Sequence, residues 1–195
     1  MTAREAGFRP LTTVTARWAH KGSFGTEHLT LEQHGKRITA TAVVISPDGE
    51  EPYAAWYQIF LDSQWQVKAV SVHRTDSRWF IARAPEPGRW CDGDGTALTR
   101  LDGCRDLLLP QACFPFSPMI RRLALPRHQS TELDTVSVSL VTLAPARSRC
   151  RITCLHPNSR YRIEDLDAAS AVDCHVDADG LVAEDAGPFK RISSR

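Results

Sequence analysis

Short runs in which apolar and polar residues alternate recur along most of the chain, with turn-forming residues between them. Residues 37–45, 53–61 and 135–143 are three such runs. A period of two places successive side chains on opposite faces of a strand, whereas an amphipathic helix requires a period near 3.6. No run with helical periodicity reaches three turns. The sequence therefore predicts a mainly β fold with at most a few short helical turns.

The length bounds the number of domains. A chain of 195 residues lies at the upper end of one ordinary domain, and a domain of this size buries roughly 70% of the surface that its unfolded chain exposes. We expect residues 1–195 to form a single β-rich domain, with residues 1–11 as a loosely ordered lead-in. The sequence lacks a glycine-rich phosphate loop, a nucleophile elbow and internal repeats, so the fold classes built on these motifs are excluded.

The charge balance bears on partners and compartment. The chain has 24 Lys and Arg residues against 23 Asp and Glu residues, so no overall field recommends nucleic acid or an anionic membrane as a partner. The first twenty residues include Arg4, Arg9 and Arg17 and no apolar run of signal-peptide length. No later segment approaches the ~18 apolar residues of a membrane span. We therefore expect a cytoplasmic protein without a transmembrane segment and without a nucleic-acid partner.

The cysteines are candidate metal ligands. Cys150, Cys154 and His156 would share one face of a strand and could in principle converge on a metal ion. The chain has no Cys-x-x-Cys motif, and cytosolic thiols are normally reduced. We therefore favour reduced, mostly buried thiols without a metal for all six cysteines: Cys91, Cys104, Cys113, Cys150, Cys154 and Cys174.

Acidic residues near glycines offer a second candidate metal site. Asp92, Asp94 and Asp102 could be imagined as calcium ligands, but their spacing does not match an EF-hand loop. Asp-Gly pairs are typical of hairpin turns, in which glycine takes the positive φ. We interpret this segment as turns, as we do the Pro47–Gly49 segment, and expect no metal and no cofactor.

One strand carries aromatic residues on both faces. Tyr53, Tyr57 and Leu61 lie on one side of the predicted strand, and Trp56 and Phe60 lie on the other. A strand that is apolar on both sides is expected to be covered twice, by a second sheet, a helix or a ligand.

Glu27 shares a strand face with Leu29 and Leu31. A carboxylate on an apolar face has two interpretations, a position at the rim of the strand or the polar anchor of a pocket. The pattern favours the rim.

A short helix is predicted before the paired arginines. Ser117 followed by Pro118 has the pattern of an N-cap and a first helical residue, so 119–123 is the predicted helix. Arg121 and Arg122 would point apart in such a helix, and only one of them could reach a given anion.

Several segments, in this order, carry a resemblance to a known family: Trp18 with GTEHLTLE, YQIFLDSQWQV, GRWCDGDGTALTRLDGCRDLLL, IRRLAL, and VDADGLVAEDAGPF with Arg191. Over residues 17–191 the chain resembles the bacterial family catalogued as putative glycolipid-binding proteins. The resemblance implies a single domain built on a curved antiparallel sheet or incomplete β-barrel, similar to lipoprotein carriers of the Lol type. It implies no catalytic residues.

The chain departs from the family pattern at four positions. Relatives have an Asn where this chain has Phe116 and an Asp where it has Leu108. They have a Tyr at the positions of Cys150 and Ile163. If the family's pocket is lined by these positions, the resemblance implies a more apolar pocket in this chain.

The function that we expect is binding of an amphiphile, a glycolipid or another lipid, in an apolar cavity with polar groups at its mouth. Burying an acyl chain contributes ~0.8 kcal/mol per methylene, so such a ligand needs no chemistry to be held. Tryptophans and tyrosines could line the cavity, although five tryptophans could equally form plain core. The expected ligand-binding residues are Trp18, Glu27, Tyr57, Trp65, Phe116, Arg121, Arg122, Arg149 and Tyr161.

Two other classes of function stay open. An enzyme acting on a glycolipid or lipid precursor could use Glu27, Asp62 or Asp102 as acid or base. This requires two carboxylates that face each other across a cleft, at ~5 to ~9 Å. A protein-interaction domain could instead use an exposed sheet edge.

Overall fold

The fold consists of two curved, open sheets. The computed structural model describes residues 7–22, 24–46 and 52–192. The nine-stranded sheet has, in spatial order, β13 (Asp185–Ala186), β14 (Phe189–Arg191), β1 (Val14–His20), β2 (Thr26–His34), β3 (Arg37–Ile45), β4 (Ala54–Asp62), β5 (Val67–Arg74), β6 (Trp79–Glu86) and β7 (Arg89–Asp92). The five-stranded sheet has β12 (Ser170–His175), β11 (Arg160–Asp165), β10 (Pro145–His156), β9 (Ser130–Val138) and β8 (Asp106–Leu108).

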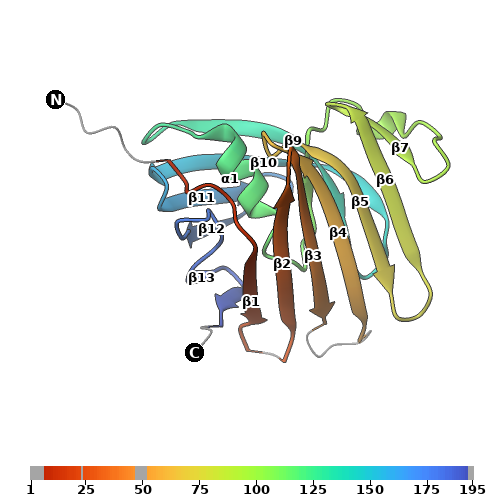
Figure 1. Ribbon diagram of the computed structural model, residues 1–195, viewed down its shortest axis with the longest axis horizontal. Helices are drawn as coiled ribbons and strands as arrows, with labels where there is room; N and C mark the ends of the chain where they lie inside the picture. Colours follow the sequence, from red (N-terminus) through yellow and green to blue (C-terminus); the bar gives the residue numbers. More distant parts are fainter. Residues whose placement is uncertain (1–6, 23, 47–51, 193–195) are drawn as a thin grey trace.

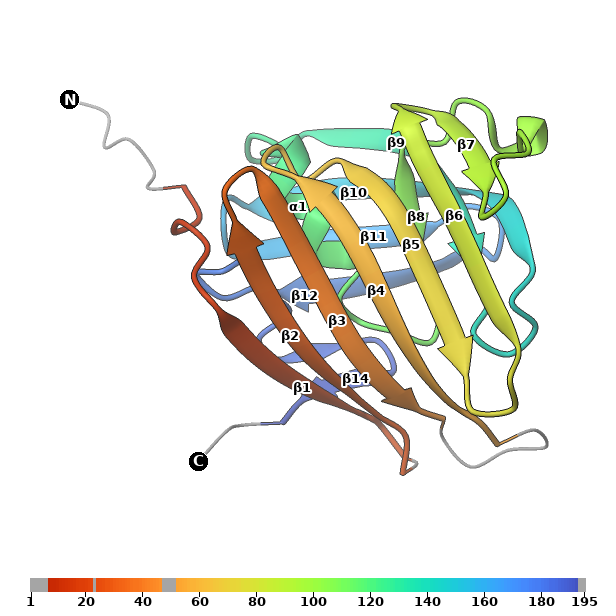
Figure 2. The same ribbon diagram turned by 45° about the vertical axis from the view of Figure 1, so that its right-hand side comes forward.

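The connectivity follows from local hairpins. Strands β1 to β7 pair antiparallel in chain order, and among the described strands only the short β8 pairs parallel, with β9. Strand β14 returns to pair with β1, so the two ends of the described chain meet in one sheet. In Figures 1 and 2 the strands of the five-stranded sheet run across those of the nine-stranded sheet and lie behind it. The predicted mainly β, single-domain fold with open sheets is confirmed.

The core lies between the facing sides of the two sheets. Tyr53, Tyr57 and Leu61 point inward and are buried, as the alternation predicts. The expectation that the opposite face of β4 is also covered is wrong, because Trp56 remains 41% exposed there. Side chains on neighbouring strands shield this face in part, since Trp56 stacks on His73 with ring centroids 4.3 Å apart. We call this solvent-facing side of the nine-stranded sheet the outer face.

Helix α1 (Phe116–Leu123) is the single α-helix among the described residues. It starts earlier than predicted, and the N-cap is Pro115 without a side-chain hydrogen bond, so the prediction of Ser117 as N-cap is wrong. Ser117 lies inside the first turn, where it is fully buried. Ala124, with φ 43°, ends the helix in the left-handed conformation. A short 3₁₀ helix, η1 (Thr99–Leu101), follows β7.

The acidic segment after β7 forms turns, as predicted. The Asp92 carboxylate accepts hydrogen bonds from the backbone N–H groups of Asp94 (3.0 Å) and Thr96 (2.9 Å), and Gly95 has φ 90°. The predicted turn at Pro47–Gly49 lies outside the described residues.

The cysteines are free thiols, and all except Cys91 are buried. The strand face expected to join Cys150, Cys154 and His156 is interrupted, because the register shifts between Cys154 and His156 and the histidine is exposed. Within residues 7–22, 24–46 and 52–192, no group of three His, Cys, Asp or Glu side chains could hold a metal ion.

Residues 7–13 form neither helix nor strand. They are nevertheless fixed to the C-terminal part of the chain, because Arg9 forms an ion pair with Asp179 and its N–H donates to the carbonyl of Ala178 at 3.0 Å. Phe8 packs against the core. In the part of the chain that the structure describes, no helix is both long enough and apolar enough to span a membrane.

Candidate functional site

A cavity of about 230 Å³ lies on the inner side of the five-stranded sheet. Strands β8, β9, β10, β11 and β12 supply one wall, and α1, β14 and the segment after β8 supply the other. We call it the inner cavity. It is lined by Leu108, Leu109, Pro110, Phe116, Ser137, Ser148, Cys150, Ile163, Asp165, Ser170, Val172, Pro188 and Phe189.

The buried part of the inner cavity's lining is apolar, and its exposed part is mixed, because Pro110 and Pro188 are exposed as well as Ser170. The buried lining residues, Leu109, Cys150, Ile163 and Phe189, are apolar or thiol side chains. The polar lining residues are partly or fully exposed, Ser170 most of all. An apolar interior with a few polar groups toward solvent is the arrangement of a small-molecule site.

The four positions that the resemblance marks as departures from the family pattern lie together in this cavity. Leu108 lies on β8, Phe116 opens α1, and Cys150 and Ile163 lie on the adjacent strands β10 and β11. All four line the inner cavity. These four residues therefore contribute apolar and thiol surface to one site.

Cys150 gives the cavity no reactive group at neutral pH. Burial raises the pKa of this thiol to about 12, with smaller contributions from the charges of Asp106 and Asp165. A protonated thiol is a weak nucleophile and behaves as a small apolar side chain. The chemistry available from the buried lining is thus apolar contact.

Glu27 anchors the chain segment that forms one cavity wall. Its carboxylate is fully buried and accepts hydrogen bonds from the Tyr57 hydroxyl at 2.5 Å and from the N–H of Cys113 at 2.6 Å. Cys113 belongs to the connection from β8 to α1, which brings Leu109 and Phe116 to the cavity. The interpretation of Glu27 as a rim residue is wrong. The connection from β8 to α1 covers the start of β2 and buries the Glu27 side chain.

Burial also changes the acidity of Glu27. It raises the pKa of the carboxyl to about 7, although the hydrogen bonds from Tyr57, Cys113 and Phe114 oppose the shift. Trp18 lies directly opposite Glu27 on β1, is fully buried, and donates from Nε1 to the carbonyl of Val182 at 3.0 Å. Trp18, Glu27 and Tyr57 thus form one buried cluster beside the wall of the cavity and are not part of its lining.

Trp65 and Arg121 form a second cluster. Trp65 lies in the turn before β5 and has φ 62°. Such a backbone is strained for a bulky residue and persists only where packing holds it. Arg121 lies over the Trp65 ring at 4.3 Å and donates to the carbonyls of Asp179 (2.6 Å) and Arg9 (3.0 Å).

The paired arginines point apart, as predicted. Arg122 forms an ion pair with the buried Asp106 at 2.5 Å, whereas Arg121 reaches the N-terminal segment. Each guanidinium is therefore occupied by groups of the protein itself.

The remaining predicted residues lie elsewhere. Arg149 is exposed and pairs with Asp167 at 3.1 Å. The buried Tyr161 accepts a hydrogen bond on its hydroxyl from the N–H of Asn158 at 3.0 Å. Of the predicted residues, Phe116 lines the inner cavity; ligand contacts by the others stay predictions.

Sequence reasoning missed several lining residues. Asp165, Val172 and Phe189 come from three segments that meet only in the folded chain. One sequence feature could have indicated Phe189, because it ends the last of the segments that resemble the family. The serines at 148 and 170 carried none, because single serines occur on many strands.

Two of the carboxylates considered for catalysis, Glu27 and Asp62, lie far apart. Glu27 pairs across the sheet with Val44, and Asp62 pairs with Arg37. These positions on β3 are seven residues, roughly 23 Å, apart. Asp102 pairs with Arg89 at 3.3 Å, beyond β7. Glu27 and Asp62 therefore do not form the acid and base pair that such an enzyme would need.

The comparisons with known proteins agree with the fold and bear on the function. Residues 15–191 match the protein family described as "Putative glycolipid-binding". The crystal structure of a DUF1089-family protein from Pseudomonas aeruginosa, at 1.80 Å resolution, aligns with a TM-score of 0.73 and 26% sequence identity over 98% of each chain. No curated protein matches the chain.

Proposed function

We propose, from the premise that this chain belongs to the glycolipid-binding family, that it binds an amphiphilic ligand in the inner cavity. The ligand is a glycolipid or another lipid. Its apolar part enters between the five-stranded sheet and Phe116, and its polar part stays near Asp165 and Ser170. No catalytic step is required.

The apolar interior of the inner cavity, with polar groups among its more exposed lining residues, is the observation that carries this proposal. An amphiphile needs apolar contacts at depth and polar partners toward solvent. Leu109, Ile163 and Phe189 are buried, while Asp165 and Ser170 are accessible. A cavity that was uniformly apolar would favour a hydrocarbon, and a uniformly polar one would favour a free sugar.

The size of the cavity limits what enters. Its volume of about 230 Å³ lies below the ~300–1,000 Å³ of typical ligand sites, so only part of a glycolipid fits inside. Burying six methylenes contributes about 5 kcal/mol before the costs of binding. That free energy corresponds to an affinity weaker than micromolar, and contacts of the head group outside the cavity must supply the rest.

The test is a titration of delipidated protein with octyl glucoside below its micelle concentration, followed by calorimetry. Ser148→Phe places a ring into the cavity from β10. Thr153→Phe places the same ring on the opposite face of that strand and serves as the matched control. We expect Ser148→Phe to weaken binding at least about tenfold, since a filled site excludes the alkyl chain, and Thr153→Phe to leave it unchanged.

Equal binding by the two variants would place the ligand elsewhere. Absence of any heat with octyl glucoside and with octanoate would refute the proposal, provided that circular dichroism shows both variants folded.

We propose that the protein binds this ligand in the cytoplasm. All six cysteines are free thiols, and free thiols persist in a reducing compartment. Cell fractionation with an antibody against the protein measures this directly, and recovery in a secreted or periplasmic fraction would contradict it.

A further inference from the structure

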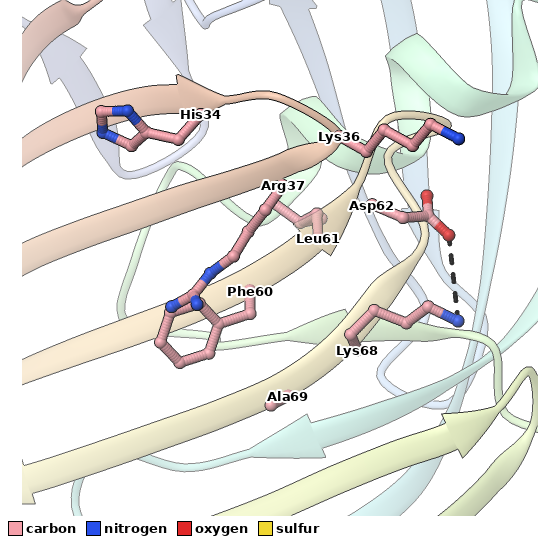
Figure 3. A pocket seen from close by; sticks show the side chains of 8 residues that line it. All are labelled: His34, Lys36, Arg37, Phe60, Leu61, Asp62, Lys68 and Ala69. Atoms are coloured by element: carbon pink, nitrogen blue, oxygen red, sulfur yellow. Dashed lines mark ion pairs between the residues drawn. The ribbon is translucent and has the colours of Figure 1, made fainter.

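A second hollow, of about 550 Å³, lies on the outer face of the nine-stranded sheet. It is formed where β2 and β4 end and where β3 and β5 begin. Figure 3 shows Arg37 and Phe60 on one side of it and the Asp62–Lys68 pair on the other. We call it the basic hollow. The amphiphile proposed above does not use it, because the inner cavity lies on the other side of this sheet.

Tight turns place the cations of the basic hollow. Gly35, with φ 62°, allows the two-residue turn between β2 and β3. This turn sets Lys36 and Arg37 next to each other at the start of β3, opposite His34. A register shift between Phe60 and Leu61 on β4 brings Lys68 to the same hollow.

The hollow has a surplus of positive charge. Lys36, Arg37 and Lys68 line it against one carboxylate, Asp62, which gives a local charge of +2 (three minus one) with His34 neutral. The whole chain has a net charge of +1, so this surplus is concentrated on one surface.

The single carboxylate of the hollow is already engaged. Asp62 accepts hydrogen bonds from the N–H groups of Gln64 (2.9 Å) and Gln66 (3.0 Å), which holds the turn from β4 to β5. Its contact with Lys68 is long, at 3.9 Å. Asp62 therefore neutralises only part of the charge around it.

Arg37 is positioned but not neutralised. Its guanidinium carbon lies 4.1 Å from the centroid of the Phe60 ring. A cation–π contact holds an arginine in place without a hydrogen bond, so its N–H donors stay available for an anion. Across the described ranges, neither Lys36 nor Arg37 forms an ion pair, whereas Arg122, Arg149 and Arg162 each pair with a carboxylate.

We propose that the basic hollow binds the anionic group of an organic phosphate or sulfate, paired by Arg37, with an apolar part of the ligand resting on Phe60 and with Lys36 and Lys68 adding to the positive field. A planar guanidinium matches two acceptor oxygens of such an anion, and the nearby ammonium groups favour its negative charge. The same chemistry is offered by a free organic phosphate and by the head group of an anionic lipid in a bilayer.

The test separates the two sources. Hexyl phosphate is titrated into the protein at low salt, with inorganic phosphate as the competitor. In parallel, the protein is sedimented with phosphatidylcholine vesicles, with and without phosphatidylglycerol. Binding of hexyl phosphate supports a free ligand, and sedimentation only with phosphatidylglycerol vesicles supports a lipid head group.

The variant Lys36→Gln/Arg37→Gln removes two charges from the hollow. The control Arg127→Gln/Lys190→Gln removes two exposed charges elsewhere, so the net charge is matched. We expect the first variant to bind the effective probe about tenfold more weakly, as the loss of the paired guanidinium and of a nearby charge at an exposed site predicts. The control is expected to stay within about twofold of the unmodified protein.

Three results would overturn the proposal. The first is equal binding by the hollow variant and the charge-matched control, the second is no binding in either arm, and the third concerns the inner cavity. Ser148→Phe, which fills the inner cavity, must leave binding of the effective probe unchanged. Loss of binding in that variant would assign the probe to the inner cavity and would also overturn the proposal. Failure of octyl glucoside to bind would refute only the proposal for the inner cavity. It would not affect the proposal for the basic hollow.

Discussion

The inner cavity and the basic hollow lie on opposite sides of the nine-stranded sheet. They differ in whether nearby charged side chains are paired. Beside the inner cavity, the guanidinium of Arg122 on α1 is paired with the buried Asp106. In the basic hollow, Lys36 and Arg37 stay unpaired within the described chain and face solvent. Solvent exposure explains this difference. An unpaired charge costs little free energy at an exposed surface, where water solvates it, and much in the core.

One strand shows how both regions arise from the same pattern. On β4, Ile59 and Leu61 point inward and are buried, while Phe60 points outward and supports Arg37. A shift of one residue in register would exchange the two faces. The apolar interior and the cationic surface are thus fixed by the same alternation, and changes on one face should leave the other intact.

The largest effect is expected at Glu27. Replacement by Ala leaves the Tyr57 hydroxyl and the Cys113 N–H without their acceptor. Two buried unsatisfied donors cost about 3 kcal/mol of unfolding free energy, which urea denaturation measures. Because the wall of the inner cavity loses its anchor, octyl glucoside binding should fall, while hexyl phosphate binding in the folded fraction should persist. A loss at both sites would show that the two regions are not independent.

The pH dependence of stability should follow the same carboxyl. Burial raises the pKa of Glu27 in the folded state from its ordinary 4.5 to about 7. The folded state then binds the proton more tightly than the unfolded state, so this contribution is fully present below pH about 4.5 and is lost as the pH rises through about 7. The difference reaches about 3 kcal/mol.

Glu27→Gln removes this titration while keeping an acceptor for one donor. The unfolding free energy of the variant, measured by denaturation from pH 4 to pH 8, should lack the decline that the unmodified protein shows. Parallel profiles for the two proteins would mean that Glu27 does not titrate in this range.

A smaller effect is expected inside the cavity. Phe116→Asn replaces a partly buried ring of the lining by a small polar side chain. Losing the apolar contact of this ring should weaken octyl glucoside binding about tenfold, measured by calorimetry, with hexyl phosphate binding unchanged. Leu125→Asn removes apolar surface near the same helix but outside the cavity and is the control; an equal loss there would point to a general effect on folding.

The smallest effect is expected on the outer face. Phe60→Ala removes the ring beneath Arg37, and a cation–π contact at an exposed site is worth about 0.5–1 kcal/mol. Binding of the effective anionic probe should weaken about threefold, with octyl glucoside binding unaffected. Thr41→Ala, on the adjacent strand of the same face, should leave both unchanged, and a similar loss in that variant would remove the role given to the ring.

Local pattern predicted the fold better than the site. The inward and outward sets of β4, the turn at Asp92 and the divergence of Arg121 and Arg122 all depend on neighbours in sequence, and all were predicted. Ser117 was misassigned as the N-cap because α1 begins at Phe116, one residue before Ser117. Glu27 was assigned to a rim because nothing near it in sequence indicates the segment around Cys113 that covers it.

The sequence by itself determined that the chain forms antiparallel strands and which residues of each strand share a face. The tertiary structure decided that Leu108, Phe116, Cys150 and Ile163 meet in one cavity and that Glu27 is enclosed. The physical reason is the sequence separation over which each effect acts. Strand and turn preferences act within a few residues, whereas a cavity is the space left where segments distant in sequence pack against one another.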